Sequence, residues 1–394
     1  MDHLSRINFK SKYSLLAIFI IGFLVRFLVS RFGYNYDYES WLIVGEITSK
    51  FKNIFAETSR YNYGFIWAYL LGIYYYIVSA LGLSLGYYRV LIIFTLTLAD
   101  AGIAYFIFKK SNLKYAILFF FNPVSIIISG FHNQFDNIAI MLALFAILTL
   151  ENALKQEKIN RYDFISLLLL SLSLITKHII FIFPLWLFFN SNINIKRKVL
   201  YLCIPPLLFL LNFTLFLPSG YNNILNNVFL YDSYNNMPLI SGALVYFGQL
   251  YSSVFRNIFM IGMVIFGYVF RKKPVDQLIL LYLLAMFSIT SAMANQYFVL
   301  PLASLFIIGK KERNLFMIWI MFYLILQFDG LNLLNILLSL ASVGFEVIHP
   351  ILNMGLHLLS DFVNISYTVA AWLCFIPLMR ETRIFKKFIS YVIS

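Results

Sequence analysis

Two carboxylates, Asp37 and Glu39, stand in the stretch "DYES" directly after the first long apolar run of the chain. A carboxylate at membrane height can bind a cation or act as the general base that takes a proton from a hydroxyl. Side chains at positions i and i+2 share a face in an extended or turned segment but not in a helix. The spacing therefore suits a loop that presents both groups together, and Asp37 and Glu39 are our catalytic candidates. A solvated loop without chemistry is the alternative.

A second polar stretch, "FHNQFDN" (131–137), separates two apolar runs. Its amide, imidazole and carboxylate side chains suit hydrogen bonding to a sugar. The spacing lacks the two-His or Cys/His pattern of a zinc site, so we expect no divalent metal and no cofactor. A wet turn between helices is the alternative. The substrate-binding candidates here are His132, Asn133, Gln134, Asp136 and Asn137.

Lys177 and His178 interrupt the apolar stretch "LITKHIIFIFP". An ammonium group close to the bilayer needs a counter-anion, and we interpret a phosphate group as that anion. The alternative is a lysine whose stem lies in apolar surroundings while its ammonium group reaches the outer surface. We therefore add Lys177 and His178 to the substrate-binding candidates.

Four further charges lie in or beside apolar runs. Arg26 and Asp100 have opposite signs, and we interpret them as a structural ion pair between neighbouring helices. Arg89 and Arg256 fall near expected outer helix ends, where an arginine can extend to the surface or bind a lipid phosphate.

Composition indicates that membrane helices position these residues. Hydrophobic residues make up 61% of the 394, charged residues only 12%, and the mean hydropathy is +0.82. These values predict an all-α polytopic membrane protein in one membrane domain, 1–394. The net charge of +13 falls in short clusters between apolar runs, which indicates topology and membrane lipid rather than a nucleic-acid partner.

Basic residues near helix ends stay on the cytoplasmic side. We place there both termini and the clusters around 6–12, 109–114, 155–161, 196–198, 271–273, 310–313 and 380–387. Crossings between successive clusters then put every polar stretch on the outer or lumenal face. That set includes "YDSYNN" (231–236) and "NQY" (295–297), the latter adding Asn295, Gln296 and Tyr297 as substrate-binding candidates.

Roughly twelve spanning helices satisfy these crossings. Residues 33–87 form the first external loop, because a span at 64–83 would invert the sides of the later clusters. The Tyr and Trp content of 64–83 suits an interfacial helix, although a span there is the alternative. Residues 331–362 form either a hairpin or an external segment.

Three stretches, in this order, resemble a known family: "DYESWLIVGEIT", then "YRVLIIFTLTLADAGIAYF" with "NPVSIIISGFHNQFDNIAIMLAL", then "LSLITKHIIFIFPLW". They are similar to the dolichyl-phosphate-glucose glucosyltransferases of asparagine-linked glycosylation, which belong to the GT-C membrane glycosyltransferases. The resemblance covers roughly residues 30–190, and "ANQYFVLPL" looks like a later landmark. The stretch "YNYGFIW" stands where that family usually has paired prolines.

The resemblance implies a GT-C fold and an inverting transfer of a hexose from a polyprenyl-phosphate carrier to a glycan or lipid-linked acceptor. By residue match, Asp37 is the catalytic base, His132, Gln134 and Asp136 lie at the donor site, and Lys177 approaches the carrier phosphate. Residues 88–190 are then the catalytic module and 191–394 a variable helical module.

Other functions remain compatible with the residues alone. A flippase or transporter of lipid-linked saccharides is also polytopic, and a GT-C mannosyltransferase has the same architecture. Chemistry on soluble nucleotides is disfavoured, because the chain has no Walker loop, Rossmann glycine fingerprint, nucleophile elbow or zinc-protease motif. The expected location is the plasma membrane in a prokaryote or the endoplasmic reticulum in a eukaryote.

Overall fold

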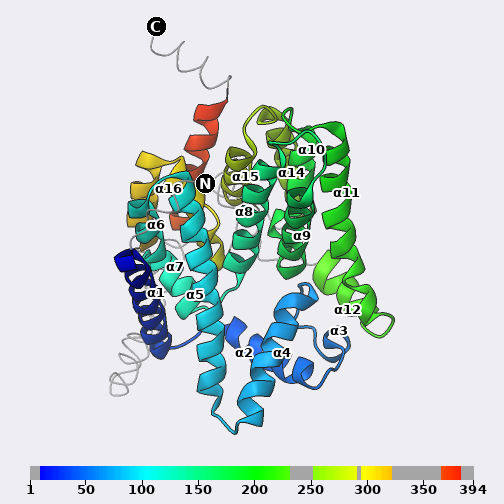
Figure 1. Cartoon of the computed structure of the whole chain (residues 1–394). Coiled ribbons are helices and arrows are strands. Elements are labelled where there is room, and N and C mark those ends of the chain that lie inside the picture. The colour runs from blue at the N-terminus through cyan, green and yellow to red at the C-terminus, as the bar shows by residue number, and fades with distance from the viewer. Residues whose placement is uncertain (1–8, 231–251, 291–293, 322–364, 383–394) are drawn as a thin grey trace, which may run out of the picture. The chain divides into compact units, whose positions relative to one another are not determined.

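The structure is a computed structural model that describes residues 9–230, 252–290, 294–321 and 365–382. Within these ranges the chain forms α-helices and short 3-10 or π turns, and no strand is present in them (Figure 1). The predicted all-α class is therefore confirmed.

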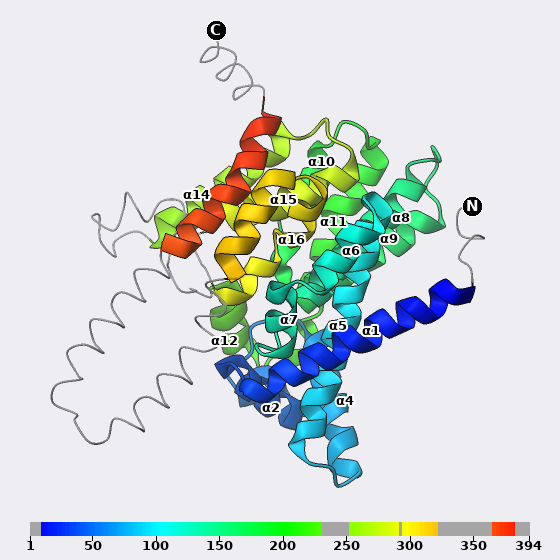
Figure 2. The ribbon, with the colours of Figure 1, turned by 90° about the vertical axis from the view of Figure 1, so that its left-hand side faces the viewer.

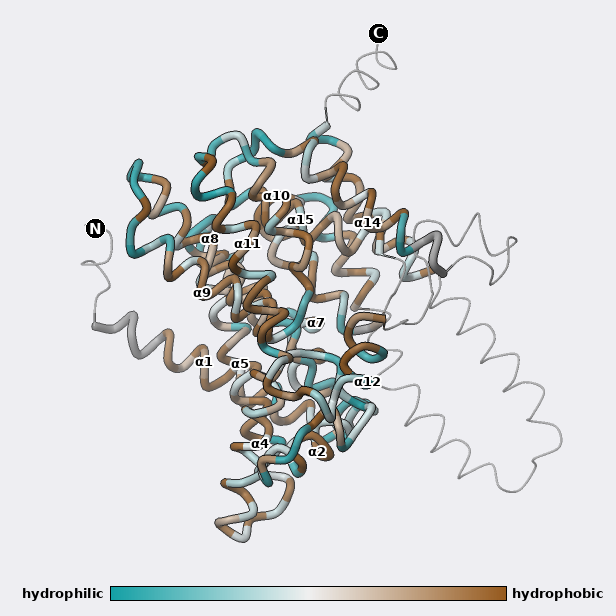
Figure 3. The backbone as a smooth tube through the Cα atoms, turned by 90° about the vertical axis from the view of Figure 1, so that its right-hand side faces the viewer, coloured by the Kyte–Doolittle hydropathy of each residue, from teal (hydrophilic) through white to brown (hydrophobic). Residues whose placement is uncertain are grey.

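Several helices have the length and apolarity that a membrane crossing requires. Four stretches of the described chain qualify: Leu15–Phe32, Leu85–Lys110, Asp136–Ala153 and Ile195–Phe216. The number rises to six if each of two bent helix pairs is one span. Figure 3 shows apolar residues along α1 and α11 and hydrophilic residues in the connection between α8 and α9. These features are those of an integral helical membrane protein.

The chain divides into two compact units. The first comprises 1–184 and 195–231, and the second 185–194 and 232–394. In the first unit, α1 (Phe9–Val29) packs against α5 (Leu85–Lys110) and α7 (Pro123–Gly130), as Figure 2 shows. A 44° bend separates α7 from α6 (Leu113–Phe120), because Pro123 has no N–H with which to continue the preceding helix.

The segment between α1 and α5 gathers at one end of α5 (Figure 1). It contains α2 (Tyr36–Ser49), α3 (Ile54–Glu57) and α4 (Phe65–Ala80), and α2 packs along α4. The helices approach closely at Gly72, where a Cβ atom would lie 2.5 Å from Oγ1 of Thr48. With 16 residues, α4 is shorter than the candidate spans. An interfacial position for 64–83 stays a prediction.

Two further helices, α8 (Asp136–Ala153) and α9 (Arg161–Thr176), form a closely packed hairpin. At Lys177 the chain leaves α9 in an extended conformation and turns by 111° toward His178–Phe189, which contains α10 (Phe183–Phe189). The end of α9 coincides with the interruption of the apolar stretch at Lys177 and His178. Whether the two limbs are separate crossings stays a prediction.

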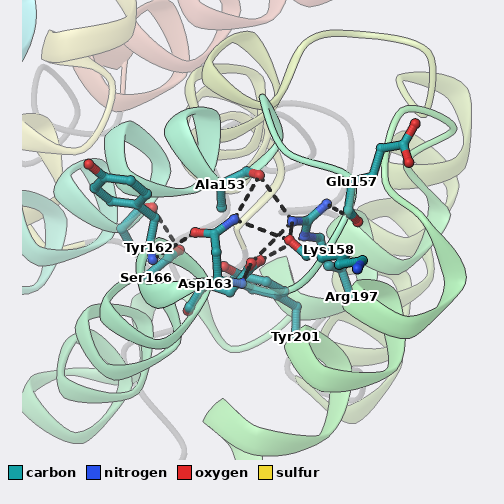
Figure 4. A network of polar contacts seen from close by, with 10 residues as sticks. Ala153, Glu157, Lys158, Tyr162, Asp163, Ser166, Arg197 and Tyr201 are labelled. Carbon is teal, nitrogen blue, oxygen red and sulfur yellow. Dashed lines mark hydrogen bonds and ion pairs between the residues drawn. The ribbon is translucent and has the colours of Figure 1, made fainter.

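A buried arginine joins the loop end of this hairpin to α11 (Ile195–Leu211) (Figure 4). Nε of Arg197 donates to Oδ1 of Asp163 at 2.8 Å, and Nη2 donates to the carbonyls of Ala153 and Lys158 at 3.0 and 2.7 Å. From the sequence, Arg197 is only part of a basic cluster that indicates topology. In the structure its side chain is buried, its charge is paired with Asp163, and its hydrogen bonds hold α11 against the α8–α9 connection.

The second unit contains α14 (Ser252–Val269), α15 (Val275–Ile289), α16 (Leu302–Ile307) and the helical stretches 310–321 and 365–381. Trp186 lies against α14, where its Nε1 donates to the carbonyl of Met263 at 2.8 Å. Two sequence predictions, the outer stretch 231–236 and the hairpin or external segment at 331–362, lie outside the described residues.

Candidate functional site

Asp37 lies in the first turn of a helix and not in a loop. Asn35 caps α2, since its Oδ1 accepts a hydrogen bond from the backbone N–H of Asp37 at 2.8 Å. The expectation of an extended or turned segment is therefore wrong. In the helix the side chains of Asp37 and Glu39 point in different directions: Asp37 is half-buried and accepts a hydrogen bond from Nε2 of Gln134, whereas Glu39 is exposed.

The stretch 131–137 does not present its polar side chains as one group. Asn133 adopts φ +54°, in the left-handed region, and its neighbours His132 and Gln134 contact Asn35 and Asp37 at the start of α2. Nδ2 of Asn133 donates to the carbonyls of Ser129 and Gly130 at 3.0 and 3.1 Å. Nε1 of Trp41 donates to the Asn133 carbonyl at 3.0 Å. Asn133, a predicted substrate ligand, thus holds the turn in shape.

Arg89 holds the same turn from α5. Its Nε donates to Oδ1 of Asn133 at 2.8 Å. Its two Nη groups donate to the carbonyls of Ser30, Gly33, Gly130 and Phe131 at 2.6 to 3.4 Å. A guanidinium that engages this many internal acceptors joins the end of α1 to the turn. Binding of a lipid phosphate by Arg89 stays a prediction.

The predicted ion pair between Arg26 and Asp100 is confirmed. Nε of Arg26 lies 2.9 Å from Oδ2 of Asp100, and both side chains are fully buried. Oγ of Ser129 donates to the same carboxylate at 2.7 Å, and Nδ2 of Asn137 donates to Oδ1 of Asp100. Asn137, another predicted substrate ligand, thus belongs to this buried network.

Lys177 is buried beside Asp136, and its Nζ lies 2.6 Å from Oδ2 of that residue. The rings of Tyr63 and Phe135 lie 5.1 and 5.0 Å from Nζ, within the range of cation–π contacts. The alternative of an ammonium group at the outer surface is therefore wrong. Asp136 supplies the counter-anion that the sequence led us to seek in a phosphate, and phosphate binding by Lys177 stays a prediction.

The segment that carries Tyr63 is tied to the end of α9. At Gly64 a Cβ atom would lie only 2.1 Å from the carbonyl oxygen of Ile175, so the two backbones touch without side chains between them. Tyr61 is fully buried, and its hydroxyl donates to the Gly64 carbonyl at 2.6 Å. These contacts place Tyr63 beside Lys177.

The two histidine candidates have different surroundings. His132 is buried, and its Nδ1 accepts a hydrogen bond from Nδ2 of Asn35 at 2.9 Å. Burial lowers the pKa of His132 to about 4, so its ring is neutral at pH 7. His178 lies near the rings of Tyr63 and Phe209, with centroids 6.2 and 6.0 Å away.

Asp37 has an electrostatic environment suited to a base. Burial raises the pKa of Asp37 above its ordinary value, and the charge of Lys177, the Gln134 hydrogen bond and the charge of Arg60 act in the opposite direction. Oδ1 of Asp136 is buried without a hydrogen-bond partner among the described residues. The arrangement joins a half-buried carboxylate with a raised pKa, an amide that donates to it and a buried ion pair, from three separate segments of the chain.

The remaining candidates belong to the second unit. Gln296 and Tyr297 are half-buried in the 3-10 helix Asn295–Val299, and Arg256 is exposed on α14. The side chain of Asn295 lies outside the described part of the chain. The substrate or lipid roles of these four residues stay predictions.

Among the described residues, no group of three or more His, Cys, Asp or Glu side chains could hold a metal ion. Comparisons with protein-family models, with curated proteins and with solved structures find no match for this chain.

Proposed function

We propose that this protein is an inverting hexosyltransferase that uses a polyprenyl-phosphate sugar as donor and a glycan or lipid-linked acceptor. The observation that supports this most is the meeting of Asp37, Gln134 and the Asp136–Lys177 pair. Such a transfer needs a base, hydrogen bonds to the sugar and a positive charge near the leaving phosphate. The half-buried carboxylate of Asp37 can act as the base, the amide of Gln134 can bond a sugar hydroxyl, and the buried ammonium of Lys177 carries the charge.

In the proposed reaction Asp37 takes the proton of the acceptor hydroxyl, and the oxygen of that hydroxyl attacks the anomeric carbon of the donor sugar. The bond between that carbon and the phosphate oxygen breaks, and the electron pair leaves with the polyprenyl phosphate. A single displacement of this kind inverts the anomeric configuration. Gln134 donates to Oδ2 of Asp37 and so fixes the plane of the carboxylate.

Lys177 contributes a positive charge near the leaving phosphate. An ammonium group acts on a phosphate as a point charge, and in the structure Nζ of Lys177 is paired with Asp136. Glu39 is exposed, and its carboxylate lies 3.7 Å from the guanidinium of Arg60. We therefore assign Glu39 to an ion pair with Arg60 and not to proton transfer.

The proposal includes a GT-C fold of about twelve spanning helices, with 33–87 as the external loop. It also places 88–190 as the catalytic module and the site on the outer or lumenal face. Cysteine labelling tests this topology in a Cys203→Ser background, because Cys203 is the exposed native thiol. A cysteine at exposed position 39 should react in intact cells or organelles, and one at exposed position 158 only after the membrane is opened.

The activity is tested with purified protein in vesicles and a labelled polyprenyl-phosphate hexose. Wild type should release polyprenyl phosphate and yield a product with inverted anomeric configuration, and Asp37→Asn should do so far more slowly. Movement of the intact donor across the bilayer without release would indicate a flippase. Selective use of a mannose donor would indicate a mannosyltransferase.

A further inference from the structure

Arg60 is a cation beside the catalytic candidate that the motifs do not indicate. Its guanidinium rests on the first turn of α2. Nε donates to Oγ of Ser40 at 3.1 Å, Nη2 donates to the carbonyl of Tyr36 at 3.3 Å, and Cζ lies 4.0 Å from the centre of the Tyr36 ring. The planar group is therefore held in place on the helix that carries Asp37.

The backbone of Arg60 is also fixed. Oγ1 of Thr58 accepts a hydrogen bond from the Arg60 N–H at 3.1 Å. The next residue, Tyr61, is fully buried, and its hydroxyl accepts from the Ala68 N–H at 3.1 Å while it donates to Gly64. Little conformational freedom is left for an incoming ligand to remove.

Arg60 and Lys177 differ in how an anion can reach them. Lys177 is buried in a 2.6 Å pair with Asp136. Arg60 is 25% exposed, and its ion pair is with Glu39, which is 48% exposed at 3.7 Å. An exposed pair of this length contributes little stability, so an incoming anion can replace Glu39 at small cost. The five N–H groups of a guanidinium exceed the contacts that Arg60 makes here.

We propose that Arg60 binds the phosphate of the donor, with its planar group paired to two phosphate oxygens. This inference rests on the proposed function and deepens it, because it names the residue that selects a phosphate-linked lipid. Arginine suits this task because its fork matches two oxygens at once, whereas an ammonium acts as a point charge. Arg60 thus supplies the directional hydrogen bonds to the phosphate, and Lys177 contributes a second positive charge.

The test measures binding of polyprenyl phosphate to the full-length protein in neutral-lipid nanodiscs. Arg60→Gln should weaken binding on the order of tenfold to a hundredfold, the effect of losing a charge-assisted contact. Arg60→Lys should retain part of the affinity. Lys52→Gln is the matched control, because it removes an exposed cation of the same external segment that pairs with Glu57 at 3.5 Å. It should bind as wild type does.

Two further probes examine the chemistry of the ligand. Polyprenol, which lacks the phosphate, should bind equally to wild type and Arg60→Gln. Phosphatidylglycerol at the same mole fraction should bind more weakly and without dependence on Arg60. An equal dependence on Arg60 for either probe would overturn the inference. Should Arg60→Gln fail to fold, Arg60→Lys decides the matter, and wild-type affinity in that variant would overturn the two-oxygen contact.

The experiment separates this inference from the proposed function. Hexosyl transfer by wild type together with unchanged binding in Arg60→Gln would overturn the role of Arg60 and leave the transferase intact. Binding that depends on Arg60 without any transfer would support the phosphate site and reject the transferase. Absence of both binding and transfer in wild type would overturn both.

Discussion

Nζ of Lys177 lies 2.6 Å from Oδ2 of Asp136, and both side chains are buried. Asp136 is the first residue of α8, and Lys177 directly follows the last residue of α9. The two helices are antiparallel neighbours, so the pair joins the open ends of their hairpin. The positive end of the α8 dipole favours the carboxylate, and the negative end of the α9 dipole favours the ammonium.

Breaking this pair should destabilise the protein strongly. Asp136→Asn leaves the buried ammonium without its counter-charge, and the expected loss is about 3 to 5 kcal/mol. The double variant Asp136→Asn/Lys177→Met should recover much of that loss, since it removes both charges. Thermal unfolding in a defined detergent measures both. A single variant as stable as wild type would contradict a close buried pair.

Turnover should depend on Asp37 far more than on Glu39. Asp37→Asn can still accept the hydrogen bond from Gln134 but cannot take the acceptor's proton, so turnover should fall by about two to four decades. Glu39→Gln should cost less than about tenfold, because it alters an exposed pair with Arg60. Turnover is measured beside donor binding, which Asp37→Asn should retain. Near-normal turnover in Asp37→Asn would falsify the assignment.

The acid limb of the pH–activity profile should follow Asp37. Its pKa is raised by burial, and a base works only when deprotonated, so kcat/KM should fall as the pH drops through that raised pKa. The positive charge of Arg60 lowers the same pKa. Arg60→Gln should therefore move the acid limb to higher pH, whereas Lys52→Gln should not. A limb that stays in place or moves to lower pH contradicts this reasoning.

Gly64 should tolerate no side chain. A Cβ atom there would lie 2.1 Å from a backbone oxygen that cannot rotate away, so Gly64→Ala should destabilise the protein by about 1 to 3 kcal/mol and displace Lys177. Gly86→Ala is the control, because its Cβ would lie 3.5 Å from Oγ of Ser84 and alanine favours helix. Thermal unfolding of the two variants gives the comparison. Equal stability would show that α9 can shift to make room.

Part of this architecture follows from local sequence. The Arg26–Asp100 pair is predictable because two opposite charges in apolar runs have few other stable solutions. The break at Lys177 is predictable because a lysine interrupts an apolar stretch. Asn35 is a local signal too, because a helix cap followed by two acids in the first turn predicts the start of a helix. This signal explains why Asp37 lies in a helix and not in the predicted loop.

The partners of the charged residues depend on packing that spacing does not reveal. Asp136 and Lys177 are 41 positions apart and meet only because α8 and α9 return to the same level. Asn133 and Asn137 resemble neighbouring ligands in sequence, yet Asn133 contacts Arg89 and Asn137 contacts Asp100. Arg60 lies in no motif and acquires its position from α2.

The α8–α9 hairpin is closed at both ends by buried charges, Lys177 with Asp136 at one end and Arg197 with Asp163 and the Ala153 carbonyl at the other. A slip of one helix against the other by one turn, about 5.4 Å, would disrupt contacts at both ends at once. Apolar side chains alone would penalise such a slip weakly, because leucine and isoleucine pack adequately in many registers. The buried charges at the two ends therefore fix the register of α8 against α9.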